Sequence, residues 1–335
     1  MIEESVEKLL KKINLSPEEM QAVMEEIMTG KCLTGQIVAF LEALSKKGET
    51  VEEITAAAKV MRSHAVKIKT DKEVILDTCG TGGDKKGTFN VSTITAFVAA
   101  GCGVTVAKHG NKAVSSSCGS ADILSALGIN IQVSKEAMEE CLDKIGIAFL
   151  FAPNLHPAMK HAMEARKQIG HRTIFNIMGP LCNPASATHQ LIGVFDQALT
   201  ETVASVLGNM GTKHALVVYG KDGLDEITLT DKTCVCEWRN SMLDKYEISP
   251  EDFGFRRVDI GELLGGNVHD NCQIMLEVLN GKHGHKRNTV LLNSAAALYA
   301  ADKVNSIKEG LSLAEEAIDS GRALKKLALL KEYTR

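Results

Sequence analysis

The stretch VILDTCGTGGDKKGTFNVST, residues 74–93, determines how the rest of the chain is interpreted. Its apolar start, Val74 to Thr78, is typical of a buried strand, and three glycines then fall within four residues. Helical spacing begins at Asn90. A strand, a glycine-rich turn and a polar helix start favour a phosphate-binding loop, because the first N–H groups of a helix point at an anion. Considered alone, the stretch also fits a structural turn.

This loop fits neither common nucleotide-binding motif. Lys85 stands where the dinucleotide fingerprint needs its third glycine, and the next strand-like run ends in basic Lys108-His109 rather than in an acidic residue. The Walker A pattern needs a lysine after its second glycine, but Thr88 follows Gly87. We therefore expect a phosphate site outside these two classes.

Length and composition limit the possible partners. A chain of 335 residues predicts one large or two ordinary domains. A net charge of −4 disfavours nucleic acid as the main partner. No apolar run approaches the roughly 18 residues of a membrane span, so no membrane association is expected. Nine scattered cysteines favour a reducing, cytoplasmic location.

The predicted fold is α/β, with a small all-helical domain before a larger α/β domain. Residues 1–70 are expected to be helical, since capping boxes at Ser16 and Thr50 precede runs with helical spacing. Residues 71–335 alternate short strands with helices, which predicts a mostly parallel central sheet flanked by helices. The expected strands are 74–78, 104–107, 147–151, 191–195 and 214–219, and the expected helices are 90–100, 120–127, 135–145, 157–169 and 199–210.

The last third of the chain has a less regular pattern. We expect two short antiparallel strands at 227–229 and 233–238, followed by helices at 268–280, 288–301, 306–320 and 321–332. The basic run His283 to Arg287 has the side chains for a metal or phosphate site. A solvated loop before a helix capped by Asn288 is the favoured interpretation.

Several polar clusters follow predicted strands, where ligands bind in parallel sheets. Lys108 to Asn111 offers a point charge and a glycine for close approach. Ser115 to Ser117 and Gly119 to Asp122 then form a second candidate anion cradle, although a polar loop with an N-cap at Ser120 is the alternative. Two cradles in sequence favour a substrate that carries phosphate or diphosphate.

A carboxylate pair and an arginine complete the candidate site. Asp225 and Glu226 follow a predicted strand and suit Mg²⁺, which usually takes one or two carboxylates plus substrate phosphates. A surface turn and general acid/base work are the alternatives. Arg166 falls on a predicted helix and either clamps a substrate carboxylate or faces solvent. Because no nucleophile–base pair is evident, we expect catalysis by positioning and leaving-group stabilisation.

Six ordered motifs resemble those of the anthranilate phosphoribosyltransferase family, over essentially the whole chain. They are GTGGD (80–84), NVST (90–93), KHGN (108–111), GSAD (119–122), the segment 175–184 and DGLDE (222–226). The resemblance implies transfer of a 5-phosphoribosyl group from phosphoribosyl pyrophosphate to the amine of anthranilate, in tryptophan biosynthesis. It also implies a Mg²⁺-dependent homodimer whose helical domain is joined by helices from about 157–190.

The resemblance further assigns residues to each ligand, with no general acid or base and with Lys108 stabilising the transition state. Metal contacts fall on Ser92, Asp225 and Glu226. Anthranilate contacts fall on Gly80, His109, Asn111, Arg166, Met178 and Pro180. Phosphoribosyl pyrophosphate contacts fall on Gly80, Gly83, Asp84, Thr88, Asn90, Val91, Ser92, Thr93, Lys108, His109, Gly110, Asn111, Lys112, Ala113, Val114, Ser115, Ser116 and Ser120.

The chain departs from the commonest family pattern at a few positions. Lys112 stands where arginine is usual, Ser117-Cys118 replaces a frequent Lys-Ser, and Tyr219 stands where histidine is common. The alternatives are a pyrimidine nucleoside phosphorylase of the same fold, whose lysine–serine phosphate motif this chain lacks, and a non-enzymatic nucleic-acid-binding relative.

Overall fold

A bundle of four helices begins the chain. The computed structural model describes residues 1–84, 86–113 and 118–335. In α2 and α4 the side chains of Ser16 and Thr50 cap the first turn, as the sequence predicts. Apolar residues at helical spacing meet inside the bundle, with Phe40 and Leu41 fully buried. The bundle helices are α1 (Ile2–Leu10), α2 (Pro17–Met28), α3 (Thr34–Lys47) and α4 (Val51–Ser63).

A seven-stranded sheet forms the centre of the second part of the molecule, in the strand order β3-β2-β1-β4-β5-β6-β7. The first five strands run parallel, and β6 and β7 are antiparallel. The predicted fold class is therefore confirmed. The strands are β1 (Ile75–Gly80), β2 (Thr105–Gly110), β3 (Ile147–Phe151), β4 (His189–Gly193), β5 (His214–Gly220), β6 (Thr233–Arg239) and β7 (Met242–Ile248).

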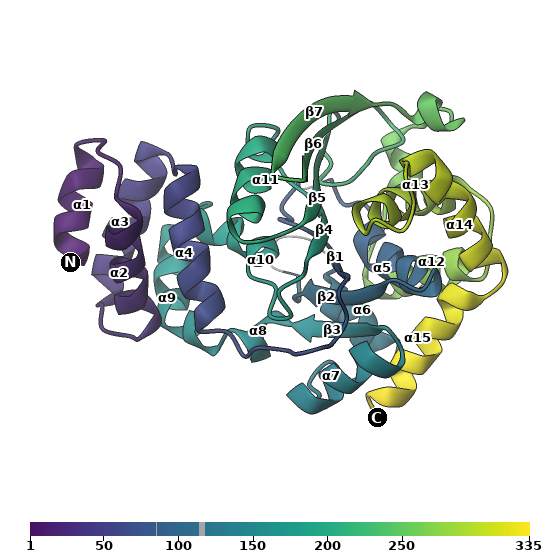
Figure 1. Ribbon diagram of the computed structural model, residues 1–335, viewed down its shortest axis with the longest axis horizontal. Helices are drawn as coiled ribbons and strands as arrows, with labels where there is room; N and C mark the ends of the chain where they lie inside the picture. Colours follow the sequence, from purple (N-terminus) through teal and green to yellow (C-terminus); the bar gives the residue numbers. More distant parts are fainter. Residues whose placement is uncertain (85, 114–117) are drawn as a thin grey trace.

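Helices cover both faces of this sheet, as Figure 1 shows. Successive side chains of a strand point to opposite faces. In β5, Leu216 and Val218 join the core under the C-terminal helices, whereas Ala215 and Val217 join the core that continues into the bundle. The helices beyond α4 are α5 (Val91–Gly101), α6 (Ser120–Ala126), α7 (Lys135–Lys144), α8 (Ala152–Leu155), α9 (Lys160–Ile169), α10 (Met178–Leu181), α11 (Leu199–Asn209), α12 (Val268–Leu279), α13 (His285–Ala300), α14 (Ile307–Asp319) and α15 (Arg322–Tyr333).

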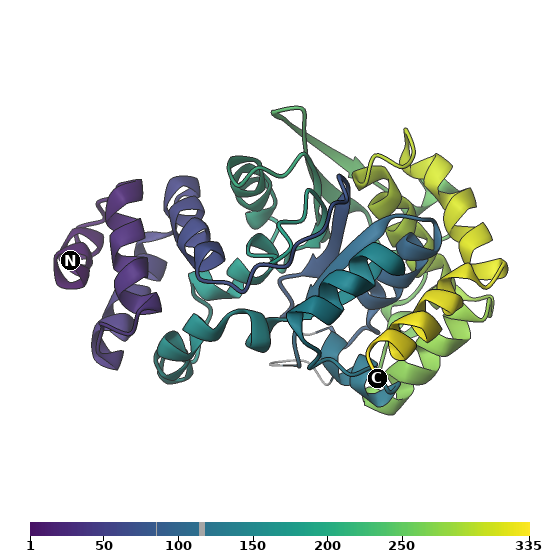
Figure 2. The same ribbon diagram turned by 60° about the horizontal axis from the view of Figure 1, so that its bottom comes forward.

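The segment between β3 and β4 leaves the sheet and returns to it. Helix α9 packs against α2 and α3 of the bundle, and Figure 2 shows it beside them. Ala162 and Ala165 of α9 lie in the same core as Phe40, while α10 packs against α4 and β2. Residues 157–190 therefore connect the bundle to the sheet. The domain boundary at residue 70 stays a prediction.

Several sequence expectations about local structure were wrong. Residues 227–229 form no strand, because a buried asparagine of α13, Asn293, hydrogen-bonds both the N–H and the C=O of Ile227 in place of a strand partner. Helix α13 begins at His285 rather than at an Asn288 cap. Strand β7 was not foreseen, and its outer residues are largely exposed. Within the described residues, no helix combines the length and apolar character needed to cross a bilayer.

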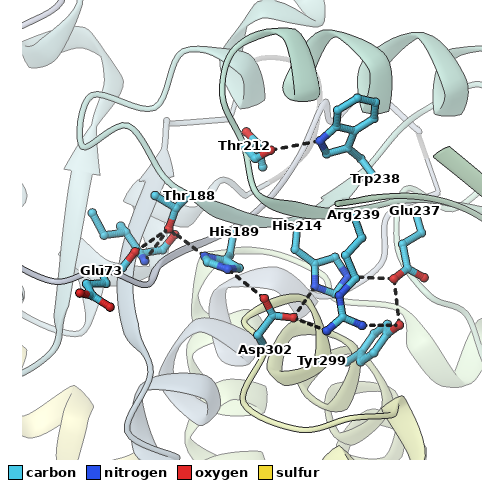
Figure 3. A network of polar contacts seen from close by, with 11 residues as sticks. Glu73, Thr188, His189, Thr212, His214, Glu237, Trp238, Arg239, Tyr299 and Asp302 are labelled. Atoms are coloured by element: carbon cyan, nitrogen blue, oxygen red, sulfur yellow. Dashed lines mark hydrogen bonds and ion pairs between the residues drawn. The ribbon is translucent and has the colours of Figure 1, made fainter. Parts of the chain in front are cut away.

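A partly buried polar network, drawn in Figure 3, holds the first residues of β4 and β5. His214 lies between two carboxylates, with Nδ1 at 2.9 Å from Asp302 and Nε2 at 3.0 Å from Glu237. Asp302 also contacts His189 and Arg239. Burial opposes ionisation of Glu237, but hydrogen bonds from His214 and two tyrosines outweigh it and lower the pKa of Glu237. Through Asp302, this network joins the sheet to the end of α13.

Candidate functional site

The loops after the parallel strands fold closely over the strand ends. Strands β1, β2, β4 and β5 each end at a glycine. A Cβ at Gly193 would lie 1.4 Å from the Asp225 carbonyl oxygen, and one at Gly80 would lie 2.6 Å from the Asp225 carboxylate. A Cβ at Gly110 would lie 2.4 Å from Ser120 Oγ. Because Gly80, Gly110 and Gly193 have no Cβ, these loops can meet over one edge of the sheet.

The glycine-rich loop after β1 has the geometry of an anion cradle. Gly82 and Gly83 have φ angles of 65° and 82°, which favour glycine. The Thr81 N–H donates to Gly193 O, and the Gly82 N–H donates to the Asp225 carboxylate at 2.9 Å. The N–H groups of Gly83 and Asp84 donate to no residue in 1–84, 86–113 or 118–335. Among the described residues, these two adjacent backbone donors have no partner, as an anion site requires.

Two partly buried carboxylates lie beside this loop. Burial and the nearby Asp84 raise the pKa of Asp225 to about 7. Burial and the neighbouring Asp225 raise the pKa of Glu226 well above its usual value. Glu226 also accepts from the Ser92 N–H at the start of α5, at 3.2 Å. Negative charge is thus concentrated where a cation would relieve the repulsion between these carboxylates.

The donor set here fits a magnesium ion that also binds substrate. In the described residues, no group of three or more His, Cys, Asp or Glu side chains is arranged to hold a metal. Asp225 and Glu226 are nevertheless hard oxygen donors, and Ser92, whose backbone N–H contacts Glu226, carries a hydroxyl as a further oxygen donor. Mg²⁺ usually keeps several waters and binds through one or two carboxylates plus phosphates. The residues present suit that mode and not an all-protein metal cage.

Lys108 is the buried cation of the site. Its Nζ donates to Thr78 O at 2.5 Å and to Ser92 Oγ at 3.4 Å. Burial lowers the pKa of Lys108, and the neighbouring Asp77 carboxylate opposes that shift. Asp77 accepts from the His109 N–H at 3.1 Å and from Asn183 Nδ2 at 2.7 Å. Together these contacts hold the end of β2 against the end of β1.

Two histidines lie behind Lys108. The His109 and His156 ring centroids are 5.1 Å apart, and His109 Nδ1 lies 3.0 Å from Gly179 O. His109 Nε2 and both ring nitrogens of His156 are buried, with no hydrogen-bond partner among the described residues. Burial lowers the pKa of His109 to about 3 and that of His156 to about 4. Both rings are neutral near pH 7.

The second predicted cradle lies after β2. Ser120 Oγ and the Ala121 N–H both donate to Asn111 O. Asp122 accepts from the Ala113 and Gly119 N–H groups, each at 3.0 Å. These contacts join residues 111–113 to the start of α6. The N-cap position of α6 is Gly119 and the helix begins at Ser120, so the alternative of an N-cap at Ser120 is wrong. The remaining predicted contacts in this segment, Val114, Ser115 and Ser116, lie outside the described residues.

The other predicted residues are spread around these two loops. Asn90 precedes α5 without capping it through its side chain, and its Nδ2 donates to Cys118 O at 3.0 Å, which brings the two loops together. Thr93 donates to Asn90 Oδ1, and Val91 is buried beneath. Thr88 forms a bridge with Leu264, and Lys112 is exposed.

The residues predicted for the second substrate come from the segment that joins the bundle. Arg166 is half-buried on α9, with its guanidinium 5.6 Å from the Phe175 ring centroid. Burial lowers the pKa of Arg166, as expected of a group turned partly inward. Met178 and Pro180 are buried in α10, which packs against β2. The structure places these residues on the bundle side of the strand ends.

The basic run near α13 does not belong to this site. His283 lies 2.9 Å from Arg287, which pairs with Asp319 at 2.7 Å. A cavity of about 200 Å³ lies beside this run, and a more open one of about 650 Å³ lies along α12. Neither is lined by residues of the glycine-rich loop or by the carboxylate pair.

Three residues that shape the site had no role assigned from the sequence. Asp77 lies beside Lys108 and accepts from Asn183, and Arg172 donates to Gly83 O in the glycine-rich loop. A charged residue inside an apolar strand was the available signal for Asp77, because such a group is buried only with partners. For Arg172 the sequence carries no comparable signal, since its contact depends on how α9 sits beside the sheet.

Comparison with known proteins agrees with this geometry. Residues 3–65 match the glycosyl transferase family, helical bundle domain, and residues 72–324 match the glycosyl transferase family, a/b domain. The anthranilate phosphoribosyltransferase of Petrotoga mobilis is 51% identical over 98% of this chain and 96% of its own length. That of Methanobrevibacter smithii is 52% identical over 100% and 99% of the two chains.

Solved structures give the same result. The anthranilate phosphoribosyltransferase of Thermus thermophilus superposes with a TM-score of 0.94 at 39% identity, covering 99% of both chains. The enzyme of Saccharomyces cerevisiae, solved in complex with PRPP and Mg, has a TM-score of 0.92 at 30% identity and covers 99% of this chain and 97% of its own. From its sequence, its two matched domains and its fold, the chain belongs to the anthranilate phosphoribosyltransferases.

Proposed function

We propose that this chain transfers the 5-phosphoribosyl group of phosphoribosyl pyrophosphate to the amine of anthranilate, releasing pyrophosphate. The observation that carries the proposal is the partly buried pair Asp225 and Glu226 beside a loop in which the N–H groups of Gly83 and Asp84 have no partner among the described residues. Carboxylates near a phosphate loop make sense when a divalent cation lies between them and a diphosphate. The yeast relative solved with PRPP and Mg supports the same ligand pair.

The donor half of the reaction is assigned to the sheet edge. Ser92, Asp225 and Glu226 would hold a Mg²⁺ ion, which would neutralise charge on the diphosphate. Lys108 adds a fixed positive charge where pyrophosphate departs, and the N–H groups of the 80–84 loop hold its oxygens. Phosphoribosyl contacts are proposed for Gly80, Gly83, Asp84, Thr88, Asn90, Val91, Ser92, Thr93, Lys108, His109, Gly110, Asn111, Lys112, Ala113 and Ser120, and for Val114, Ser115 and Ser116, which lie outside the described residues.

The acceptor half is assigned to the bundle side. Arg166 holds the anthranilate carboxylate, Gly80 and Asn111 approach from the strand ends, and His109, Met178 and Pro180 line the pocket. Because the aromatic amine is already neutral near pH 7, no strong base is needed before attack. His109 is neutral and its Nε2 has no partner among the described residues, which suits a pocket wall beside the apolar ring of anthranilate.

Three further properties belong to the same proposal. The enzyme requires Mg²⁺, works as a homodimer and acts in the cytoplasm. The helical domain, residues 1–70, takes in helices from about 157–190, which is supported by the packing of α9 on α2 and α3. The α/β domain spans the remainder of 71–335 and carries the donor site.

The first test follows anthranilate fluorescence with time. Signal loss should require protein, phosphoribosyl pyrophosphate and Mg²⁺ together. Asp225→Asn combined with Glu226→Gln should weaken the Mg²⁺-dependent turnover, whereas Glu251→Gln, at an exposed carboxylate, is the matched control and should leave it unchanged. Folded protein that leaves anthranilate unchanged but cleaves pyrimidine nucleosides with phosphate would move the assignment to the phosphorylases of this fold.

A further inference from the structure

Arg172 joins three segments of the chain at the glycine-rich loop. It lies in the linker after α9, and its Nη2 donates to Gly83 O. Its guanidinium lies 3.6 Å from the ring centroid of Phe195, in the loop after β4. The Phe195 N–H in turn donates to Thr81 Oγ1 at 3.1 Å. The guanidinium therefore contacts the glycine-rich loop both directly and through Phe195.

This contact fixes the direction of a backbone donor. A trans peptide is planar, so the Gly83 carbonyl and the Asp84 N–H point to opposite sides. With the carbonyl held by Arg172, the Asp84 N–H is turned away from Arg172, and it donates to no residue in the described part of the chain. Glycines at 82 and 83 would otherwise let this peptide rotate at little cost.

We propose that Arg172 is a positioning residue for the phosphate donor, holding the Gly83–Asp84 peptide so that its N–H faces the diphosphate. The inference rests on the proposed function and extends it to a residue outside the substrate contacts assigned above. Arg172 follows Arg166 by six residues on the chain. One segment therefore carries both Arg166, assigned to anthranilate, and Arg172, which orders the glycine-rich loop assigned to phosphoribosyl pyrophosphate.

Arginine is suited to this task and lysine is not. A guanidinium stacks flat on an aromatic ring while its edge donates in plane, whereas an ammonium is a point charge without that plane. Arg172→Lys keeps the charge and loses the stacked geometry, and Arg172→Met removes both. Lys167→Met on α9 removes an exposed charge nearby and serves as the control.

The kinetic readout separates positioning from general damage. Arg172→Met should raise the KM for phosphoribosyl pyrophosphate about tenfold, as expected for losing one charge-assisted hydrogen bond, and leave the KM for anthranilate near wild type. The KM of Arg172→Lys for phosphoribosyl pyrophosphate should lie between those of wild type and Arg172→Met. Both KM values of Lys167→Met should match wild type. Equal rises in both KM values, or none in either, would overturn the proposal.

A second readout needs no turnover. In the ligand-free full-length protein, the ¹⁵N amide resonance of Asp84 should move in Arg172→Met and in Phe195→Leu, but not in Lys167→Met. An unmoved Asp84 resonance in both variants would refute the positioning role, and Phe195→Leu keeps the test available if Arg172→Met does not fold. If the two variants show these shifts but the wild-type protein consumes no anthranilate, the proposed function is contradicted while the positioning role stays intact.

Discussion

Replacing His156 by leucine should remove part of the acid sensitivity of the fold. His156 is 5% exposed, and neither ring nitrogen has a partner among the described residues. Burial lowers the pKa of His156 to about 4, from about 6.5 in an unfolded chain. A base with a depressed folded pKa contributes stability above the unfolded pKa and loses it as the pH falls toward the folded pKa.

The size of the effect follows from that difference. Between pH 7 and pH 5 the unfolded ring takes up its proton while the folded ring does not. The folded state should therefore lose about 2 kcal/mol of unfolding free energy through His156 alone. Asp77 and Asp225 act in the opposite sense over this range, because burial raises the pKa of Asp77 to about 6 and that of Asp225 to about 7. The contribution of His156 to the pH dependence of stability is therefore obtained by comparing the variant with wild type at both pH values.

The assay is urea unfolding of both proteins at pH 7 and pH 5, followed by circular dichroism. The drop in unfolding free energy from pH 7 to pH 5 should be smaller in His156→Leu than in wild type by about 2 kcal/mol. Replacement of the exposed His269 by leucine should leave the wild-type drop unchanged. If His156→Leu shows the full wild-type drop, the ring is protonated as readily in the folded protein as in the unfolded chain, and the burial argument fails.

Further substitutions test other parts of the structure. Glu53, fully buried, accepts from two backbone N–H groups and from Lys47, so Glu53→Ala should cost about 3–5 kcal/mol in chemical unfolding; a loss below 1 kcal/mol would contradict this estimate. Gly193→Ala should abolish turnover, because its Cβ would lie 1.4 Å from a backbone oxygen, whereas Gly35→Ala, with nothing within 4 Å, should remain active. Arg166→Ala should chiefly raise the KM for anthranilate; a selective rise in the KM for phosphoribosyl pyrophosphate would refute its assigned role.

The sequence predicted the sheet and the glycine-rich loop well, because both are local in character. Buried parallel strands give continuous apolar runs, and a Gly-Thr-Gly-Gly turn before a helix is visible in the letters alone. Strand ends were less certain: 191–195 was expected where β4 is His189–Gly193, since its first residues are a buried His and Gln. Polar residues buried by a network lack the apolar signal of a strand.

The candidate site was predicted in its members but not in its internal contacts. Asp225 and Glu226 could be predicted as site residues because they are adjacent acidic residues soon after a predicted strand. That the Gly82 N–H donates to Asp225, or that Asp77 lies beneath Lys108, depends on distances across the sheet. The absent strand at 227–229 has the same origin, because Asn293, 66 residues away, takes up the hydrogen bonds of Ile227.

The hydrogen bond from the Gly82 N–H to the Asp225 carboxylate makes that side chain an internal competitor of the substrate. A phosphate oxygen can use the Gly82 donor only after the carboxylate has left it. Any cation that attracts the Asp225 carboxylate elsewhere raises the affinity of the loop for phosphate. By thermodynamic reciprocity, bound phosphate raises the affinity for the cation by the same factor. Cooperativity between cation and diphosphate is therefore built into one hydrogen bond of the ligand-free protein, without a change in the fold.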